Sequence, residues 1–501
     1  MKIAPWLLLF SCIGVFALRL FIAFSSAGLS GDDAYFHLRQ IEHIQHTGLP
    51  LFEDPLSYGG RTYVFSPLFH YVIAATTLIL PVTVAVKAVP NLLATLLMPI
   101  IYLIVRRLSK REGVALFTAI FSSFVPVWFG HTINTLSPIT LAIPLLFFVL
   151  YAWMRVEDAR WRYVYLCSLI VFAFTHPLSL LFVLGLMLYL ILLLVEHMEC
   201  ERTALEVTIF SIFFVLWSQF LMYKKFIIAH GPGVVWQNIP ASLLSSFFAD
   251  VTILTAIYQI SFLPVVYGVF VVYRYLFRRK HKMTYFLIAF TLAAGLLLWF
   301  RLIPLQFGLV LLGMFLLVLF SRWVDFYLGY ILTTRFHRFS GLYILILIIA
   351  FVLTSVLPSW GVAWNTQRDA LSPEGLRAYS WIRDNTPSDA VIVAAVEEGH
   401  RITALTGRKN VLDLHFLLQR DAKQRVQDVN RILTTTIGIE ALELLERYGA
   451  STILVSPTTK QASDIHALSY ADASRCFART FDEGGYLVYQ KHPYCQVEVV
   501  A

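Results

Sequence analysis

Long apolar runs separated by short polar breaks fill the first 360 residues of the chain. A helix that crosses a bilayer needs about 20 apolar residues, and runs of that kind recur from Trp6 to Trp360. They predict about 11 to 13 transmembrane helices. We expect the clearest of them near residues 5–24, 85–107, 113–129, 138–154, 160–175, 177–195, 204–223, 251–275, 283–300, 303–320 and 341–358. The first run is too long for the apolar core of a secretory signal, which predicts an uncleaved first span.

Beyond residue 360 the pattern changes to short helical and strand periods. "LSPEGLRAYSWIRDNTP" and "GIEALELLERYGA" predict helices, "AVIVAAV" and "STILVS" predict buried strands, and "DEGGYLVYQ" predicts a turn into a closing edge strand. The pattern therefore predicts a polytopic α-helical membrane protein with a C-terminal soluble α/β domain. The expected domains are 1–360, with a first external loop at 25–84, and 361–501.

Composition excludes a soluble protein, because 58% of the 501 residues are hydrophobic and only 14% are charged. The net charge of +8 is distributed unevenly. The segment Asn365 to Ala501 carries 15 Lys and Arg against 17 Asp and Glu, so the membrane part holds the whole basic excess. This distribution indicates membrane orientation rather than nucleic-acid binding.

The basic loops predict the orientation of the chain. They lie at 106–112, 154–162, 273–282 and 321–338, and we expect them to face the cytoplasm. They share one side only if the short apolar segment Pro67 to Pro81 does not cross the bilayer. The amino terminus is then cytoplasmic, whereas the loops at 31–61 and 223–250 and the C-terminal domain are extracytoplasmic. This arrangement predicts a multi-pass protein of the cell membrane.

Two of the five cysteines, Cys476 and Cys495, lie in the expected soluble domain. An extracytoplasmic location would permit a disulfide between them. Their spacing alone favours two independent thiols, and no Cys-x-x-Cys pattern points to a metal site.

Two adjacent carboxylates, Asp32 and Asp33, directly follow the first apolar run. At a membrane boundary a carboxylate can remain partly solvated beside a low-dielectric pocket, where it can serve as a general base or a metal ligand. The same pair could start an interfacial helix, because Asp at a helix amino end offsets the helix dipole. The pair alone favours the helix start.

The surrounding residues favour catalysis. "DDAYFHLR" followed by "GLPLFEDPLSYGGR" resembles the first external loop of GT-C superfamily membrane glycosyltransferases, most closely the catalytic subunit of archaeal and bacterial oligosaccharyltransferase, in a divergent form. In that family an Asp followed by an aromatic residue and an Arg contributes to the catalytic site. The resemblance implies that Asp32 or Asp33 is catalytic, with His37 and Arg39 as nearby polar groups.

A second segment, "WFRLIPLQFGLVLLG", resembles the Arg-hydrophobic-Pro segment of the same family, whose Arg contacts the donor phosphates. The resemblance implies that role for Arg301, because a guanidinium at the interface can bind a phosphate bidentately while its stem lies in the apolar layer. Arg61 and Lys224 could add positive charge around the phosphate. Arg301 could equally serve only to anchor the end of its span, and cations such as Arg61 and Lys224 more often do only that.

The chain also departs from the family pattern. The family's second external loop carries an acidic motif that helps hold a divalent metal such as Mg²⁺ or Mn²⁺. This chain has "FGHTINTLSP" there, with His131 and Asn134 but no carboxylate. If a metal is bound, Asp32 or Asp33 is its expected ligand. The family's acceptor-reading motif is replaced by "AAVEEGH", and "SSFFAD", ending at Asp250, is the nearest counterpart of a Ser/Thr-x-x-Glu loop motif.

The outer histidines His37, His131 and His176 have no ligand-like spacing, so hydrogen-bonding roles are expected ahead of metal binding.

The resemblance implies an oligosaccharyltransferase-like enzyme that transfers a sugar or oligosaccharide from a polyprenyl-phosphate or polyprenyl-diphosphate donor to a protein or glycan acceptor outside the membrane. A lipid-linked glycan transporter or flippase is the alternative from another class. Transporters generally place ionisable residues near the middle of their spans, whereas the central thirds of these spans are almost free of charge. A non-catalytic protein that binds a lipid-linked glycan is a third possibility.

Overall fold

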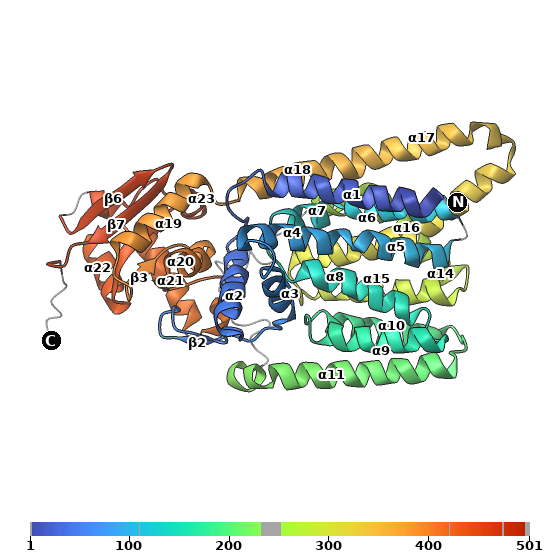
Figure 1. Cartoon of the computed structure of the whole chain (residues 1–501), viewed down its shortest axis with the longest axis horizontal. Coiled ribbons are helices and arrows are strands. Elements are labelled where there is room, and N and C mark those ends of the chain that lie inside the picture. The colour runs from blue at the N-terminus through green and yellow to red at the C-terminus, as the bar shows by residue number, and fades with distance from the viewer. Residues whose placement is uncertain (1–2, 110, 232–251, 420, 473–474, 496–501) are drawn as a thin grey trace. The chain divides into compact units, whose positions relative to one another are not determined.

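The computed structural model describes residues 3–109, 111–231, 252–419, 421–472 and 475–495. The described residues form two compact units (Figure 1). The first falls within Met1–Ser25, Ser66–Lys225 and Leu244–Arg368, and the second within Ser26–Phe65, Phe226–Leu243 and Asp369–Ala501. Most of the loop expected at 223–250, including Asp250, lies outside the described residues.

The first unit is a bundle of helices that run alongside one another (Figure 1). Its helices are α1 (Ile3–Ala23), α3 (Leu68–Thr76), α4 (Val82–Thr95), α5 (Leu97–Leu108), α6 (Glu112–Ser123), α7 (Pro126–Ile133), α8 (Ile139–Trp153), α9 (Ala159–Ala173), α10 (Ser179–Val195), α11 (Arg202–His230), α13 (Ile253–Ile260), α14 (Phe262–Phe277), α15 (Lys282–Trp299), α16 (Leu305–Thr333), η2 (Arg335–Phe339), α17 (Ser340–Phe351), the π-helical turn η3 (Val352–Val356) and α18 (Leu357–Arg368).

Among the described residues, six helices are long and apolar enough to cross a membrane, or up to eight if each bent pair counts as one span. The bent pairs are α6 with α7, at 50°, and α13 with α14, at 97°. Helices α8 and α10 are apolar but have only 15 and 17 residues. All but one of the predicted spans thus coincide with these apolar helices, and the lower number reflects short or broken helices. The span expected at 160–175 coincides with α9, a helix of 15 residues. The chain is a multi-pass membrane protein.

Two helices bear on the predicted topology. Helix α3, within the apolar segment that was expected not to cross, has nine residues. At 1.5 Å per residue it is about 13.5 Å long, too short for a hydrocarbon core of about 30 Å. Helix α16 continues for 29 residues and takes in the first part of the basic stretch at 321–338.

The second unit combines residues of the first predicted external loop with the C-terminal part of the chain. Its elements are α2 (Asp33–Thr47), β1 (Glu53–Asp54), β2 (Arg61–Thr62), α19 (Pro373–Asn385), β3 (Val391–Val393), η4 (Val396–Glu398), α20 (Gly399–Thr406), β4 (Lys409–Asn410), η5 (Phe416–Leu418), α21 (Ala422–Thr434), α22 (Gly438–Arg447), β5 (Ala450–Val455), α23 (Pro457–Ser463), α24 (Ser469–Asp472), β6 (Phe477–Glu483) and β7 (Tyr486–Lys491).

A five-stranded mixed sheet with the order β4-β3-β5-β7-β6 forms the core of this unit. Strands β4, β3 and β5 are parallel, and β7 is antiparallel to both β5 and β6. The predicted class, a polytopic helical protein with a small α/β unit, is confirmed. The expectation that "DEGGYLVYQ" leads into an edge strand is wrong, because β7 pairs on both sides and β6 is the edge. The first four residues of β7 are buried, which suits an interior strand.

Cys476 and Cys495 form a disulfide with a Cα–Cα distance of 5.5 Å. The prediction of two independent thiols is therefore wrong. The hairpin explains the pairing, because Phe477 lies opposite Lys491 in the β6–β7 register. The backbone N–H of His492 also donates to the carbonyl oxygen of Cys476 at 2.9 Å. The spacing of two cysteines does not reveal that a hairpin places them side by side.

Candidate functional site

The two adjacent carboxylates at the start of α2 have different surroundings. Asp32, the N-cap residue, is only 4% exposed, whereas 51% of the Asp33 side chain is exposed. The sequence could not distinguish between the two residues. Their exposure does, because only Asp33 presents its carboxylate to solvent.

Asp32 connects the start of α2 to the start of α20. Its two carboxylate oxygens accept hydrogen bonds from the backbone N–H groups of His400, at 3.1 Å, and Arg401, at 2.8 Å. These amides belong to the first turn of α20, where backbone N–H groups have no partner within the helix and the dipole favours an anion. Burial raises the pKa of Asp32 to about 7, against the lowering effect of Arg401 and the two amides. We infer that Asp32 holds α2 in place.

The close approach around α20 requires a glycine. A Cβ on Gly399 would lie 2.2 Å from the carbonyl oxygen of Leu412 and 2.4 Å from the Cβ of Asp413. A Cβ atom essentially never comes within 3.0 Å of another heavy atom to which it is not bonded. A larger residue would therefore push the following loop away from α20. Gly399 therefore allows the segment that carries Asp413 to lie against the residues at the start of α20.

Asp33 lies among histidines. Its Oδ2 is 3.3 Å from His37 Nε2, one helical turn further along α2, and its Oδ1 is 3.8 Å from His415 Nε2. Partial burial acts to raise the pKa of Asp33, but the neighbouring imidazoles of His37, His415 and His400 outweigh it and hold that pKa below its usual value. The carboxylate is therefore ionised at neutral pH.

His400 and His415 contact each other directly. His415 Nδ1 is 2.8 Å from His400 Nε2, so one imidazole donates a hydrogen bond to the other. Burial lowers the pKa of His400, and burial together with the neighbouring His400 lowers the pKa of His415 to about 3. Both rings are neutral at pH 7. The ring of Phe36 packs against them, with centroid distances of 5.4 Å to His400 and 4.5 Å to His415.

A buried row of alternating charges supports this group. Arg39 Nη2 donates to Asp54 Oδ1 at 2.7 Å, and Arg61 Nη2 lies 3.3 Å from Asp54 Oδ2. Arg61 also donates from both terminal nitrogens to the two oxygens of Asp413, with a distance of 2.6 Å for Nη1 to Oδ1. The backbone N–H of His415 donates to Asp413 Oδ1 at 2.9 Å. The row thus connects the 26–65 segment to the loop that carries His415.

This geometry bears on two predicted residues. Arg61, a candidate phosphate ligand, has a side chain that is only 1% exposed and is held by two carboxylates. Arg39, a candidate active-site residue, has a side chain that is 15% exposed and is paired with Asp54. Their contacts in the structure are those of residues that position the loop, and phosphate binding by Arg61 remains a prediction.

The other predicted residues belong to the first unit. Arg301 lies in the turn between α15 and α16, is exposed and has a φ of 53°, a left-handed conformation that costs energy for any residue but glycine. His176 Nδ1 accepts a hydrogen bond from the backbone N–H of Leu178 at 3.0 Å. Asn134 Nδ2 donates to Gln367 at 3.1 Å. That these residues share a pocket with Asp33 remains a prediction.

Two further candidates also lie in the first unit. Lys224 is exposed near the end of α11, and His131 lies in the short helix α7. Among the described residues, Asp33, His400 and His415 bring their metal-ligand atoms close together, and His131 is not one of them.

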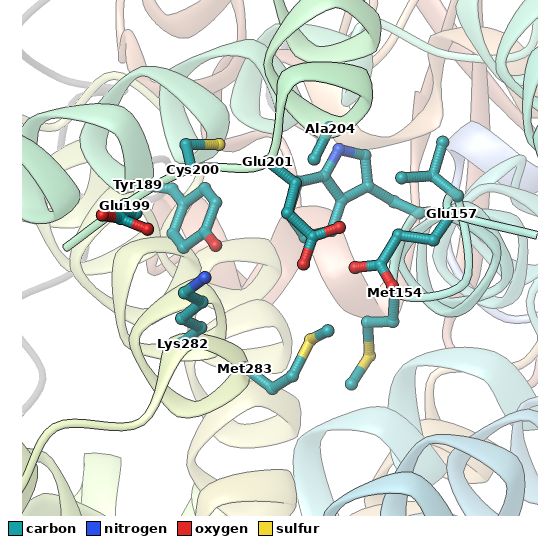
Figure 2. Close-up of a pocket in the computed structure, with 11 residues that line it drawn as sticks. Met154, Glu157, Tyr189, Glu199, Cys200, Glu201, Ala204, Lys282 and Met283 are labelled. Carbon is teal, nitrogen blue, oxygen red and sulfur yellow. The ribbon is translucent and has the colours of Figure 1, made fainter.

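The first unit contains a pocket that is lined by none of the predicted site residues. Figure 2 shows its lining, which includes Glu157, Glu201, Tyr189 and Lys282. Its volume of about 30 Å³ can hold water but not a sugar. We therefore assign the candidate site to the carboxylate and histidines of the second unit.

No family model and no curated protein sequence matches the chain. Solved structures do. The oligosaccharyltransferase of Archaeoglobus fulgidus in its apo form is similar over 97% of this chain and 75% of its own, with 12% identity and a TM-score of 0.67. Its complex with an inhibitory peptide and a dolichol-phosphate matches 96% of this chain and 74% of its own, with 14% identity and a TM-score of 0.62. The chain has a GT-C fold.

A second GT-C structure supports this assignment. ArnT from Cupriavidus metallidurans, bound to undecaprenyl phosphate, is similar over 99% of this chain and 99% of its own, with 13% identity and a TM-score of 0.56. Identities this low establish the GT-C fold and leave the reaction open. The predicted resemblance to a divergent GT-C glycosyltransferase of the oligosaccharyltransferase type is therefore confirmed at the level of the fold.

Four residues at this site were not predicted from the sequence: His400, Arg401, Asp413 and His415. His400 is the last residue of the "AAVEEGH" segment that replaces the family's acceptor-reading motif, and Arg401 follows it directly. The other two lie in "NVLDLHF", where an Asp and a His occur two residues apart after a buried strand. That combination of an acid and a base beside a strand end is the signal that could have drawn attention to them.

Proposed function

We propose that this chain is a membrane glycosyltransferase that uses a sugar or oligosaccharide carried on a polyprenyl phosphate or diphosphate. The GT-C fold supports the proposal, since the solved structures that share it include an oligosaccharyltransferase with a dolichol-phosphate and ArnT with undecaprenyl phosphate. The proposed acceptor is a protein or glycan on the extracytoplasmic side, where we also place the second unit.

The observation that carries the proposal is the ionised, half-exposed carboxylate of Asp33, held in place by its buried neighbour Asp32. In the proposed reaction Asp33 accepts or orients the proton of the acceptor group, which attacks the anomeric carbon. The bond between that carbon and the phosphate oxygen breaks, and the polyprenyl phosphate leaves with the electron pair. Arg301 is proposed to stabilise the charge that develops on the phosphate.

The test compares lipid-linked glycans and glycoproteins by mass spectrometry in cells with the intact gene, without it, and with variants in its place. We expect loss of the gene to remove one glycan from the acceptor and to leave its lipid-linked precursor in excess. Asp33→Asn and Arg301→Gln should reproduce that loss, whereas the exposed control Asp389→Asn should not. Full glycosylation with both site variants would refute the assignment of these residues.

The same experiment separates the alternatives. A flippase that is lost would leave the lipid-linked precursor on the inner leaflet and reduce every product made from it. A non-catalytic binding protein would bind the lipid-linked sugar without turnover, and its loss would leave the acceptor glycans unchanged. Purified full-length protein, incubated with a polyprenyl-linked sugar, would then show binding but no release of polyprenyl phosphate.

A further inference from the structure

Three side chains from distant parts of the sequence converge in the second unit: Asp33, His400 and His415. Their ligand-type atoms all lie within 4.8 Å of one another. His400 is fully buried, the His415 side chain is 32% exposed, and Asp33 is half exposed. They come from the first turn of α2, the first turn of α20 and the loop before η5.

One explanation is a hydrogen-bonded histidine pair beside a surface acid. That explanation accounts for the contact of 2.8 Å between His415 Nδ1 and His400 Nε2. It does not explain why so many surrounding contacts fix the positions of these three side chains. Phe36 packs on both rings, Arg61 and the His415 backbone fix Asp413 behind them, and Asp32 fixes the start of α2. The surrounding contacts therefore hold two imidazoles and a carboxylate near one another, with one ligand-type atom of each within 4.8 Å of the other two.

We propose that Asp33, His400 and His415 bind a first-row divalent transition-metal ion. Such ions bind His nitrogen and carboxylate oxygen at about 2.0–2.2 Å, which in tetrahedral geometry places neighbouring ligand atoms about 3.3–3.6 Å apart. The two imidazole nitrogens, now 2.8 Å apart, therefore need to separate by about 0.5–0.8 Å. The Asp33 carboxylate needs to move inward, and its exposure leaves room for it to rotate.

The donor atoms determine which metal suits the site. Mg²⁺ and Ca²⁺ prefer oxygen ligands, whereas imidazole suits Zn²⁺, Fe²⁺ and Co²⁺. Two histidines and one carboxylate therefore select Zn²⁺ over Mg²⁺, one of the two metals named for the family's acidic motif. Asp32, the other ligand expected from the sequence, is not included, because its two oxygens accept the α20 amides.

Three protein ligands leave coordination positions open, as in catalytic zinc sites. Asp33 and His415 are partly exposed, so a metal held there would be accessible from solvent. This inference rests on the proposed function where it takes Asp33 as the catalytic carboxylate: one Asp33 oxygen would bind the metal, and the other would remain to accept or orient the acceptor proton. An open position on the metal would then accept an oxygen of a phosphate or of the acceptor. Metal binding itself does not depend on that reaction.

The test uses the full-length chain without a histidine tag, purified in detergent and stripped with EDTA. Titration with Zn²⁺ against a chromophoric chelator should give one tight site per chain, at least about 100-fold tighter than that for Mg²⁺. Co²⁺ should give the visible absorption of a low-coordinate site. His400→Ala, His415→Ala and Asp33→Asn should each weaken Zn²⁺ binding at least about tenfold. The control His466→Ala, an exposed histidine of the same unit, should not.

Wild-type affinity for Zn²⁺ in these three variants, or equal affinity of the wild type for Zn²⁺ and Mg²⁺, would overturn the proposal. If His400→Ala does not fold, Asp33→Asn decides, since its side chain is half exposed. The proposed function can be refuted without refuting the metal site. A chain that binds Zn²⁺ at this site but transfers no sugar would support the metal site and refute the proposed reaction. Full transfer by His400→Ala and His415→Ala without Zn²⁺ binding would leave the metal site without a part in the reaction.

Discussion

The carboxylate of Asp32 accepts a hydrogen bond of 2.8 Å from the backbone amide of Arg401, a residue 369 positions later in the chain. This contact separates two neighbouring acids. Asp32 is buried and holds α2 against α20, whereas Asp33 is half exposed. In the proposed function, a pair of acids that looks redundant in the sequence is divided between support and chemistry.

The first prediction separates those tasks. Asp32→Ala leaves two buried amides without their acceptor, which should lower the stability of the chain by about 1–3 kcal/mol. Asp33→Asn should change stability by less than about 0.5 kcal/mol, as expected for a half-exposed position, while abolishing transfer. Thermal unfolding of the full-length protein in detergent measures both effects, with Asp389→Ala as the exposed control. Equal destabilisation by the two substitutions would contradict the division of roles.

The ion pair of Arg61 and Asp413 is the second target. Removing one partner of a buried pair leaves an uncompensated charge, so Arg61→Met alone should cost about 3–5 kcal/mol. Asp413→Asn should also destabilise the protein, and the double variant should be more stable than the sum of the two losses predicts. A double-mutant cycle measured by unfolding checks this coupling. Strictly additive losses would mean that the pair makes no mutual contribution.

These two contacts, between residues far apart in the chain, could not be predicted from the sequence. Asp33, His37 and Arg39 were found because they occur in one short stretch, next to an apolar run. The α20 amides that Asp32 accepts from, and the Asp413 partner of Arg61, lie more than 350 residues away, and local periodicity carries no information on which distant residues meet. The helical spans were predictable for the opposite reason, since a bilayer imposes length and apolarity on each segment separately.

The third prediction concerns pH and depends on Asp54. Burial acts to raise its pKa, but Arg39, Arg61 and Tyr63 outweigh burial and lower that pKa below the usual 3.8. A carboxyl whose pKa is lower in the folded state stabilises the fold above its unfolded pKa and loses that effect as the pH falls through its folded pKa. Wild-type stability should therefore fall below about pH 4.

The variant Asp54→Asn isolates this group. It should be less stable than the wild type at pH 6, and the difference should shrink as the pH approaches 3, because the Asp54 carboxyl of the unfolded chain then takes up a proton while the lowered pKa keeps the folded one ionised to lower pH. Thermal midpoints of both proteins between pH 6 and 3 provide the measurement. A difference that stays constant across this range would show that the charge of Asp54 does not stabilise the fold.

The close approach at Gly399 gives a fourth prediction. An added Cβ would meet the Leu412 carbonyl at 2.2 Å, so Gly399→Ala should cost about 1–3 kcal/mol as an overpacking change. Because the shifted loop carries His415, transfer and Zn²⁺ binding should weaken as well. Gly438→Ala is the matched control, since its nearest contact would be at 4.0 Å. The melting temperatures of the two variants should therefore differ, and identical values would exclude a steric requirement at Gly399.

The disulfide provides a test of membrane orientation. Disulfides persist in oxidising compartments and are rare in the cytosol, so the bond between Cys476 and Cys495 supports an extracytoplasmic second unit.

The chain has five cysteines, and Cys12, Cys167 and Cys200 are free. Protein taken from cells, denatured and treated with a maleimide-polymer reagent, should accept three labels without reductant and five after reduction. The variant Cys476→Ser should accept four in both conditions. Five labels on the unreduced wild type would place the second unit on the reducing side of the membrane and reverse the predicted orientation.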